Sequence, residues 1–298
     1  MGLASARRFA AIRTKVAMTN IWTDYELLDF GKGRKLERFG PWVVDRPCPG
    51  VGGAKPGAAD WKRASGRFEE VWSPPVDEWD TRECMIEVGN LGFSLGLAPL
   101  PSGQIGVFPE QFANWRWIAR QVERAEKPLR ALNLFAYTGG STLAAARAGA
   151  EVTHVDAAKS VVARARDNAA ASGLANAPIR WIVEDALKFC QREVKRANHY
   201  DAVILDPPSY GHGPKSEAWQ IERDLLPLLQ LCGELTASRR AFVLCSCHTL
   251  GIGPAELSAY LSDGVFGHCG QPPASGTLYL ETGEGRKLAS GVFARWPA

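Results

Sequence analysis

The residues best suited to chemistry in this chain stand at the ends of short apolar segments. One such segment is followed by Asp206-Pro207-Pro208-Ser209-Tyr210. The two prolines fix the local backbone and remove two N–H donors, so Asp206 and the loop carbonyls can face a planar polar substrate. Tyr210 could stack on the same substrate through its ring. We therefore take Asp206 and Tyr210 as candidate catalytic residues.

A third candidate lies in Cys245-Ser246-Cys247-His248, which also follows an apolar segment. Alternation along a strand places Cys245 and Cys247 on the same face. Buried cysteine is a common core residue, so at least one of the two is expected to be inert. Cys247 lies nearer the end of the strand and could act as a nucleophile, with His248 nearby. A free thiol has a pKa of about 8.5, so such a site would have to favour the thiolate.

A glycine pair and two isolated acids are typical of a site for a nucleoside cofactor. Gly139 and Gly140 let the backbone turn sharply toward a ligand, and the helix predicted to follow them offers free N–H groups. Asp156, 16 residues beyond Gly140, could accept both hydroxyls of a ribose, and Asp185 could accept an adenine amino group. Each acid could instead be a helix N-cap. The pattern G-x-G-x-x-G is absent, so NAD is not the expected cofactor.

These residues would be positioned by alternating strands and helices that begin near residue 129. Strands that are apolar throughout predict a parallel sheet with helices on both faces, and such sheets bind ligands beyond the carboxyl ends of their strands. The predicted strands are 129–135, 151–155, 179–183, 202–205 and 241–245, the helices 141–148, 159–171, 186–196, 216–237 and 254–261, and a closing hairpin 277–280 with 292–295. Helix 216–237 is expected to break near Pro227. The predicted fold class is α/β, with a Rossmann-like sheet of seven strands.

The N-terminal part of the chain predicts a small β-rich domain before that sheet. Its short candidate strands are separated by glycine- and proline-rich turns, at 25–29, 35–39, 42–45, 85–88 and 92–97. Its tryptophans could stack bases but more often fill the core of a small sheet domain, and we favour the core. The expected parts are a flexible extension 1–20, the β-rich domain 21–110, a connecting helix 111–128 and the α/β domain 129–298.

Composition narrows the class of protein further. The chain has 298 residues, a formal net charge of +3 and seven cysteines. Because no C-x-x-C pair occurs, we expect no disulfide framework, no metal site and a cytoplasmic location. No apolar run is long enough to cross a membrane. The first 23 residues hold four basic residues and no acid, a composition that a targeting segment also has. Residues 21–110 hold 10 basic and 14 acidic residues. This net negative charge is a weak basic footprint for a nucleic-acid enzyme.

The order of these motifs resembles that of class I methyltransferases that use S-adenosylmethionine. Within it, L-N-L-F-A-Y-T-G-G (132–140), H-V-D (154–156) and L-D-P-P-S-Y (205–210) look like motifs of the bacterial 23S ribosomal RNA cytosine-C5 methyltransferases and their relatives. The segment G-V-F-P-E-Q (106–111) resembles a part of that family that lies near the cofactor. A small β-rich domain before the catalytic domain is a further similarity.

This resemblance implies S-adenosylmethionine as the cofactor and RNA, with ribosomal RNA as one candidate, as the substrate. In S-C-H (246–248), Cys247 would inherit the role of a catalytic cysteine that adds to C6 of cytosine, and Asp206 would support the ring at N3. The implied cofactor contacts are Gln111, Phe135, Tyr137, Thr138, Gly139, Gly140, Asp156, Ala157, Asp185, Ala186 and Asp206.

Two other functions fit the same motifs. The Asp-Pro-Pro loop also resembles loops that bind an exocyclic amine, in which case the acceptor would be adenine N6, a protein or a small molecule, and no cysteine would be needed. A methyltransferase-like fold could also serve as a non-catalytic RNA-binding module. The sequence leaves the acceptor atom and the oligomeric state open.

Overall fold

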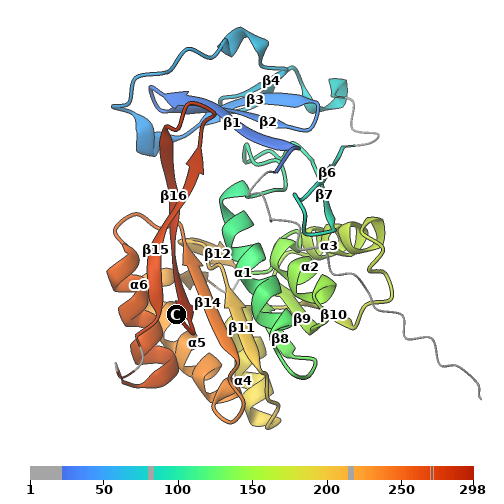
Figure 1. Cartoon of the computed structure of the whole chain (residues 1–298), viewed down its shortest axis with the longest axis vertical. Coiled ribbons are helices and arrows are strands. Elements are labelled where there is room, and N and C mark those ends of the chain that lie inside the picture. The colour runs from blue at the N-terminus through green and yellow to red at the C-terminus, as the bar shows by residue number, and fades with distance from the viewer. Residues whose placement is uncertain (1–21, 80–83, 214–217, 269, 271) are drawn as a thin grey trace, which may run out of the picture.

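The chain folds into a small sheet at one end and a larger sheet flanked by helices at the other, joined by a long hairpin near the C-terminus (Figure 1). The predicted extension 1–20 lies outside the part of the chain that can be placed. The computed structural model describes residues 22–79, 84–213, 218–268, 270 and 272–298.

The larger sheet has seven strands in the order β10-β9-β8-β11-β14-β16-β15. They are β8 (Arg130–Leu134), β9 (Glu151–Asp156), β10 (Ile179–Val183), β11 (Ala202–Leu205), β14 (Phe242–Cys247), β15 (Ala274–Glu281) and β16 (Lys287–Trp296). The first five of these strands pair in parallel, and β16 pairs antiparallel with β14 and β15. The direction of strand succession reverses between β8 and β11, which is where open α/β sheets bind their ligands. The predicted Rossmann-like sheet of seven strands is confirmed.

Helices cover both faces of this sheet. They are α1 (Phe112–Glu123), α2 (Gly140–Arg147), α3 (Lys159–Ala171), α4 (Ala186–Lys195), α5 (Ile221–Thr236) and α6 (Pro254–Leu261), with a π-helix, η5 (Ser262–Phe266), after α6. Successive residues of a strand point to opposite faces. Ala202 and Ile204 of β11 share a core with α1 and α2, whereas Val203 and Leu205 share a core with α4, α5 and α6.

The N-terminal part consists of a five-stranded sheet and a separate hairpin. Its elements are β1 (Tyr25–Gly31), β2 (Arg34–Phe39), β3 (Trp42–Pro47), β4 (Gly66–Phe68), β5 (Trp72–Ser73), β6 (Met85–Glu87) and β7 (Ser94–Gly96), with short helical turns η1 (Pro49–Val51), η2 (Trp61–Arg63), η3 (Val76–Glu78) and η4 (Pro109–Gln111). Trp22, Trp42, Trp72 and Trp79 are buried, so the prediction that these tryptophans fill a core is confirmed.

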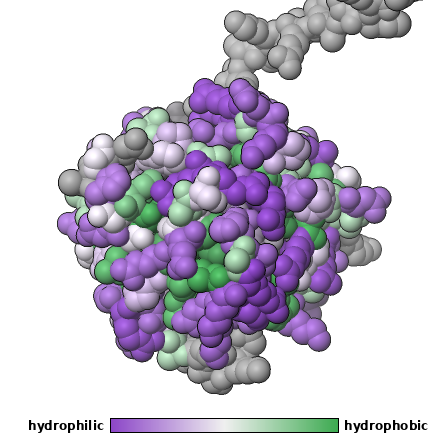
Figure 2. All heavy atoms as spheres, turned by 90° about the horizontal axis from the view of Figure 1, so that it is seen from below, coloured by the Kyte–Doolittle hydropathy of each residue, from purple (hydrophilic) through white to green (hydrophobic). Residues whose placement is uncertain are grey.

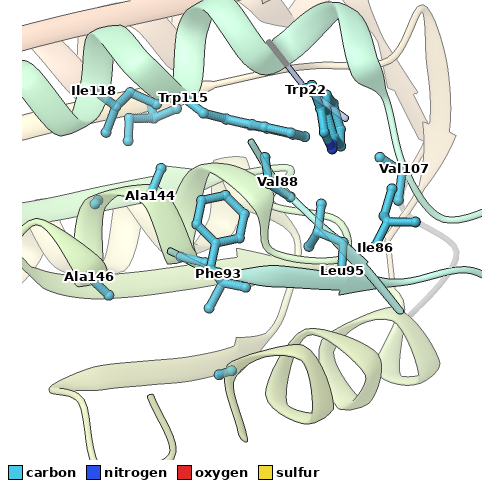
Figure 3. Close-up of a cluster of buried hydrophobic side chains, with 14 of the residues drawn as sticks. Trp22, Ile86, Val88, Phe93, Leu95, Val107, Trp115, Ile118, Ala144 and Ala146 are labelled. Carbon is cyan, nitrogen blue, oxygen red and sulfur yellow. The ribbon is translucent and has the colours of Figure 1, made fainter. Parts of the chain in front are cut away.

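That core does not stop at the β-rich part. Figure 3 shows Trp22 and Phe93 in one cluster with Trp115 of α1 and Ala144 of α2. The ring centroids of Trp22 and Phe93 each lie 6.0 Å from that of Trp115. A continuous apolar core therefore joins the N-terminal strands to the helices of the larger sheet.

Two predicted features of helix 216–237 are wrong. Residues 218–220 form a strand, β13 (Ala218–Gln220), which pairs with β12 (Tyr210–His212), while 216 and 217 lie outside the described residues. Trp219 stabilises this hairpin because its indole N–H donates to the carbonyl of Pro208 at 2.7 Å. The helix is also unbroken at Pro227, which is exposed, so water can satisfy the carbonyl that its missing N–H leaves free.

The β15–β16 hairpin reaches the small sheet (Figure 1), where its turn binds a buried carboxylate. Asp29 of β1 is 1% exposed and accepts hydrogen bonds from the backbone N–H groups of Phe30 and Gly57, from the indole of Trp61 and from Arg286 of the β15–β16 turn. Burial alone would raise the pKa of Asp29, but these donors outweigh it and hold the pKa below its ordinary value.

Replacing Asp29 by alanine should lower the free energy of unfolding by about 2 kcal/mol at neutral pH, because four donors lose a charged acceptor. A carboxyl whose pKa is depressed in the folded state stabilises the fold above its unfolded pKa and loses that contribution as the pH falls through its folded pKa. The difference between wild type and variant in urea unfolding should therefore shrink in acid. Glu69→Ala, which removes an exposed pair with Arg67, is the control and should change stability by less than about 0.5 kcal/mol. An equal effect of both variants would contradict this role.

Candidate active site

A cavity of about 470 Å³ lies at the carboxyl ends of the parallel strands, within the range of roughly 300–1,000 Å³ that is usual for small-molecule sites. Among the residues that sequence reasoning selected, its lining contains Phe135, Tyr137, Asp156, Ala157, Asp185, Ala186 and Asp206. A smaller adjoining cavity of about 40 Å³ is lined by Gln111, Thr138 and Gly140 and shares several residues with the larger one. The structure thus brings most of the expected cofactor residues together, and only Gly139 lines neither cavity.

The turn after β8 has an unusual backbone. Phe135 and Tyr137 have φ angles of 53° and 47°, and Gly139 has φ 95°. Residues other than glycine rarely adopt such angles, and where they do the strain often marks a functional turn. Gly140 is required for a different reason, because a Cβ there would lie 2.4 Å from the ring of the buried Trp115. The turn therefore brings its backbone close to the cavity and starts α2 beside it.

Two carboxylates line the cavity at the ends of β9 and β10. We call this the far side of the cavity. Asp156 accepts hydrogen bonds from the N–H groups of Tyr137 and Ala158, both at 2.9 Å. Burial raises the pKa of Asp156 against the opposing effect of these backbone donors. Asp185 caps α4 by accepting from the N–H of Lys188 at 2.9 Å while also lining the cavity. The helix-cap and ligand-binding interpretations of Asp185 are therefore compatible.

Asp206 also lines the cavity and follows β11 directly. In the sheet, β11 lies on the other side of β8 from β9 and β10. Its two carboxylate oxygens accept hydrogen bonds from Ser246 at 2.8 Å and from the amide nitrogen of Gln111 at 3.0 Å. Gln111 belongs to η4, is buried and accepts from Asn114 of α1 through its own oxygen. This chain of hydrogen bonds fixes the orientation of the Asp206 carboxylate.

His248, which follows β14, lines the cavity beside Asp206. Its Nε2 lies 3.5 Å from an oxygen of Asp206, and its Nδ1 lies 3.8 Å from an oxygen of Glu110. Burial alone would lower the pKa of His248, but the charges of Asp206 and Glu110, with a hydrogen bond to Asp206, raise it to about 9. The imidazole is therefore protonated at neutral pH and completes an ion pair at the cavity.

Cys247 does not reach the cavity. Its side chain is 1% exposed and packs in the core formed with α4, α5 and α6, where its sulfur accepts from the N–H of Thr249 at 3.4 Å. Alternation along β14 places Ser246 and His248 on the opposite side of the strand, toward Asp206. This placement contradicts the expectation that Cys247 is the nucleophile.

Tyr210 also departs from its expected position, because it begins β12 with 68% of its side chain exposed and lines neither cavity. The aromatic side chains of phenylalanine, tyrosine and tryptophan that line the larger cavity are Phe108, Phe135, Tyr137 and Trp219. Of these aromatic residues, sequence reasoning missed Phe108 and Trp219, and it treated His248, which also lines the cavity, only as a helper of Cys247. The position of Phe108 within the segment G-V-F-P-E-Q was the one available signal.

The sheet order, the glycine turn after the first strand and the carboxylates after the next two define a nucleoside-binding enzyme of the Rossmann-like class. A sequence model described as S-adenosylmethionine-dependent methyltransferase matches residues 60–258, and the chain belongs to that family. It is therefore an enzyme that uses S-adenosylmethionine as its cofactor. The cavity fits this molecule, because aspartates line it on both sides and can complement ribose hydroxyls, an amino group and a positive sulfonium.

Solved structures support the same assignment. A methyltransferase from Agrobacterium tumefaciens is 35% identical, with a TM-score of 0.84 over 92% of this chain and 90% of that one. SMU.776, a methyltransferase complexed with SAH, shares the fold at 19% identity and a TM-score of 0.68, over 92% of this chain and 75% of that one.

Curated relatives match a shorter part of the chain. The ribosomal RNA large subunit methyltransferase K/L of Shewanella baltica is 34% identical over 43% of this chain and 19% of its own length. The protein of the same name from Pseudoalteromonas translucida is 28% identical over 48% of this chain and 21% of its own length. The match thus spans about a fifth of each relative.

In the part of the chain that the structure describes, no helix is long and apolar enough to cross a membrane. Figure 2 shows that the end opposite the small sheet presents mainly hydrophilic residues around smaller apolar areas. No group of three or more potential metal ligands occurs among the described residues.

Proposed function

We propose that this enzyme methylates a nitrogen atom of a base in RNA without a cysteine nucleophile, and that large-subunit ribosomal RNA is the first substrate to test. The observation that carries this proposal is the position of Asp206, whose oriented carboxylate faces the cavity while the thiol of Cys247 faces the opposite side of the sheet. The names of the curated relatives support RNA as the substrate.

The cofactor would occupy the far side of the cavity. S-adenosylmethionine supplies an electrophilic methyl group on a sulfonium that leaves as a neutral thioether. Asp156 would accept the ribose hydroxyls, Asp185 would accept the adenine amino group, and the turn through Gly140 would lie beside the methionine part. Phe135 and Ala186 contribute apolar surface to the same cavity.

The acceptor base would lie between the cofactor and Asp206. Phe108 and Tyr137, whose ring centroids are 5.2 Å apart, form an aromatic wall on which a base can stack. Asp206 would accept a hydrogen bond from the acceptor N–H and take its proton as the nitrogen lone pair forms the new bond to carbon. A nitrogen has the lone pair that a cytosine C5 lacks, so alignment alone suffices and no covalent activation is required.

Methyl transfer from isotopically labelled S-adenosylmethionine tests both parts of this proposal. The full chain is offered total cellular RNA, separated ribosomal RNA or a protein extract, each with the same labelled cofactor. We expect label in RNA, located on a base nitrogen by nucleoside analysis. Label confined to protein would overturn the RNA substrate, and label on cytosine C5 would overturn the acceptor chemistry.

In the same assay, Cys247→Ser should retain methyl transfer within about threefold of wild type, because the thiol does not reach the cavity. Cys232→Ser is a matched control, since Cys232 is a buried cysteine of α5 in the same core. Rates are normalised to the folded fraction, measured by S-adenosylmethionine binding. A loss of several hundredfold in Cys247→Ser alone would restore the cysteine mechanism.

A further inference from the structure

The surroundings of Asp206 include two residues that the proposed function leaves without a role. Glu110 of η4 is 8% exposed, and its Oε2 has no hydrogen-bond partner among the residues that the structure describes. It does not line the larger cavity. Its other oxygen lies 3.8 Å from Nδ1 of His248, on the opposite side of the imidazole from Asp206. His248 thus lies between two carboxylates, one facing the cavity and one buried behind it.

We propose that Glu110 and His248 form a positioning pair that holds the carboxylate of Asp206 oriented toward the acceptor. This inference rests on the proposed function of Asp206 as the group that contacts the acceptor. A protonated imidazole has an N–H on each ring nitrogen and a positive charge that both carboxylates attract, whereas neutral imidazole has one N–H and no charge. Glu110 therefore favours the charged form of His248, whose Nε2 lies 3.5 Å from the carboxylate of Asp206.

Two uncharged polar groups also lie beside His248. From η4, the amide nitrogen of Gln111 lies 3.4 Å from Nε2, but it donates to Asp206 and Ser246 and does not accept from the ring. From β16, the backbone of Ser290 contributes a hydrogen bond that favours the charged ring. The ring of Phe108 lies 6.3 Å away, centroid to centroid, and carries no charge. Only Asp206 and Glu110 among these neighbours carry a charge, and both are negative.

The charges beyond Glu110 come from the small sheet. Lys35 of β2 lowers the pKa of Glu110, as His248 does, but burial is the larger effect and raises that pKa above its ordinary value. Lys35 also lies 3.1 Å from Glu37, which makes a second pair with Arg46 of β3. The charge of Glu37 adds to the effect of burial and also raises the pKa of Glu110. The N-terminal sheet thus sets the electrostatic surroundings of the pair.

The experiment measures the titration of His248 directly, in the full chain without ligand, by NMR of the imidazole. The resonance is assigned by its loss in His248→Gln. Wild-type His248 should titrate near pH 9, and Glu110→Gln, which keeps the side-chain shape, should lower its pKa by about one unit or more. An unchanged midpoint in Glu110→Gln would overturn the pair. Because no substrate is present, this result does not depend on whether RNA is the acceptor.

The pH profile of kcat/KM then tests the link to Asp206, with whichever acceptor the enzyme methylates. The alkaline limb should fall with the deprotonation of His248 and should move to lower pH in Glu110→Gln by the same amount as the NMR midpoint. Glu26→Gln is the matched control, because Glu26 is an exposed acid that lines the same groove as Glu110 behind η4; it should move neither quantity. If Glu110→Gln fails to fold, His248→Gln carries the test, since retention of the alkaline limb in that variant would overturn the proposal.

Discussion

Replacing Asp206 by asparagine should lower kcat for methyl transfer by about a thousandfold, the middle of the range for removing a general base. Asparagine has nearly the same shape, but its amide group cannot take a proton and offers a donor where the carboxylate offers an acceptor. One of the two donors that now hold Asp206, Ser246 or Gln111, would then face another donor. Single-turnover transfer of a labelled methyl group measures the effect on the chemical step.

The same variant should bind S-adenosylmethionine within about threefold of wild type, because the cofactor contacts are assigned to the far side of the cavity. Asp167→Asn, which alters an exposed acid of α3, is the control for a general charge effect and should leave kcat unchanged. Full activity in Asp206→Asn would remove Asp206 from the chemistry. Loss of cofactor binding with loss of activity would instead place Asp206 at the cofactor.

The location of the site was predictable because it follows from patterns that act over short distances. Strands that are apolar throughout and separated by helices indicate a parallel sheet, and the carboxyl ends of such strands share one edge. Asp156, Asp185 and Asp206 could therefore be grouped from their positions after β9, β10 and β11, although they are far apart in the sequence. All three line one cavity in the structure.

The chemistry of the site was less predictable because it depends on which face of a strand meets a distant segment. Alternation in β14 separates Cys247 from Ser246 and His248 but does not say which face is functional. That choice is made by Gln111 and Glu110 of η4, more than 130 residues earlier, which place hydrogen bonds and negative charge on the Ser246 side. Tyr210 likewise points outward because of the β12–β13 hairpin, which depends on Trp219 packing against Phe135 at 4.8 Å between ring centroids.

Replacing Asp156 by alanine should weaken the binding of S-adenosylmethionine by about a hundredfold, which calorimetry on the ligand-free chain measures. A hydrogen bond to a charged group contributes about 1.5–3 kcal/mol, and a hundredfold change corresponds to about 2.7 kcal/mol, so losing two ribose hydroxyl contacts is sufficient. The variant also removes the acceptor for the N–H of Tyr137, whose positive φ needs support from its surroundings.

Asp156→Asn separates these two contributions of Asp156. It keeps one oxygen that can accept from the backbone of the turn but loses the negative charge and one acceptor, so an intermediate loss of about tenfold is expected. Asp167→Ala on the exposed side of α3 should bind the cofactor normally. If Asp156→Ala bound S-adenosylmethionine as tightly as wild type, the ribose would have to lie elsewhere in the cavity, and the assignment of its far side to the cofactor would fail. If Asp156→Asn were as weak as Asp156→Ala, the charge of the carboxylate, rather than the support it gives to the strained turn, would account for the affinity.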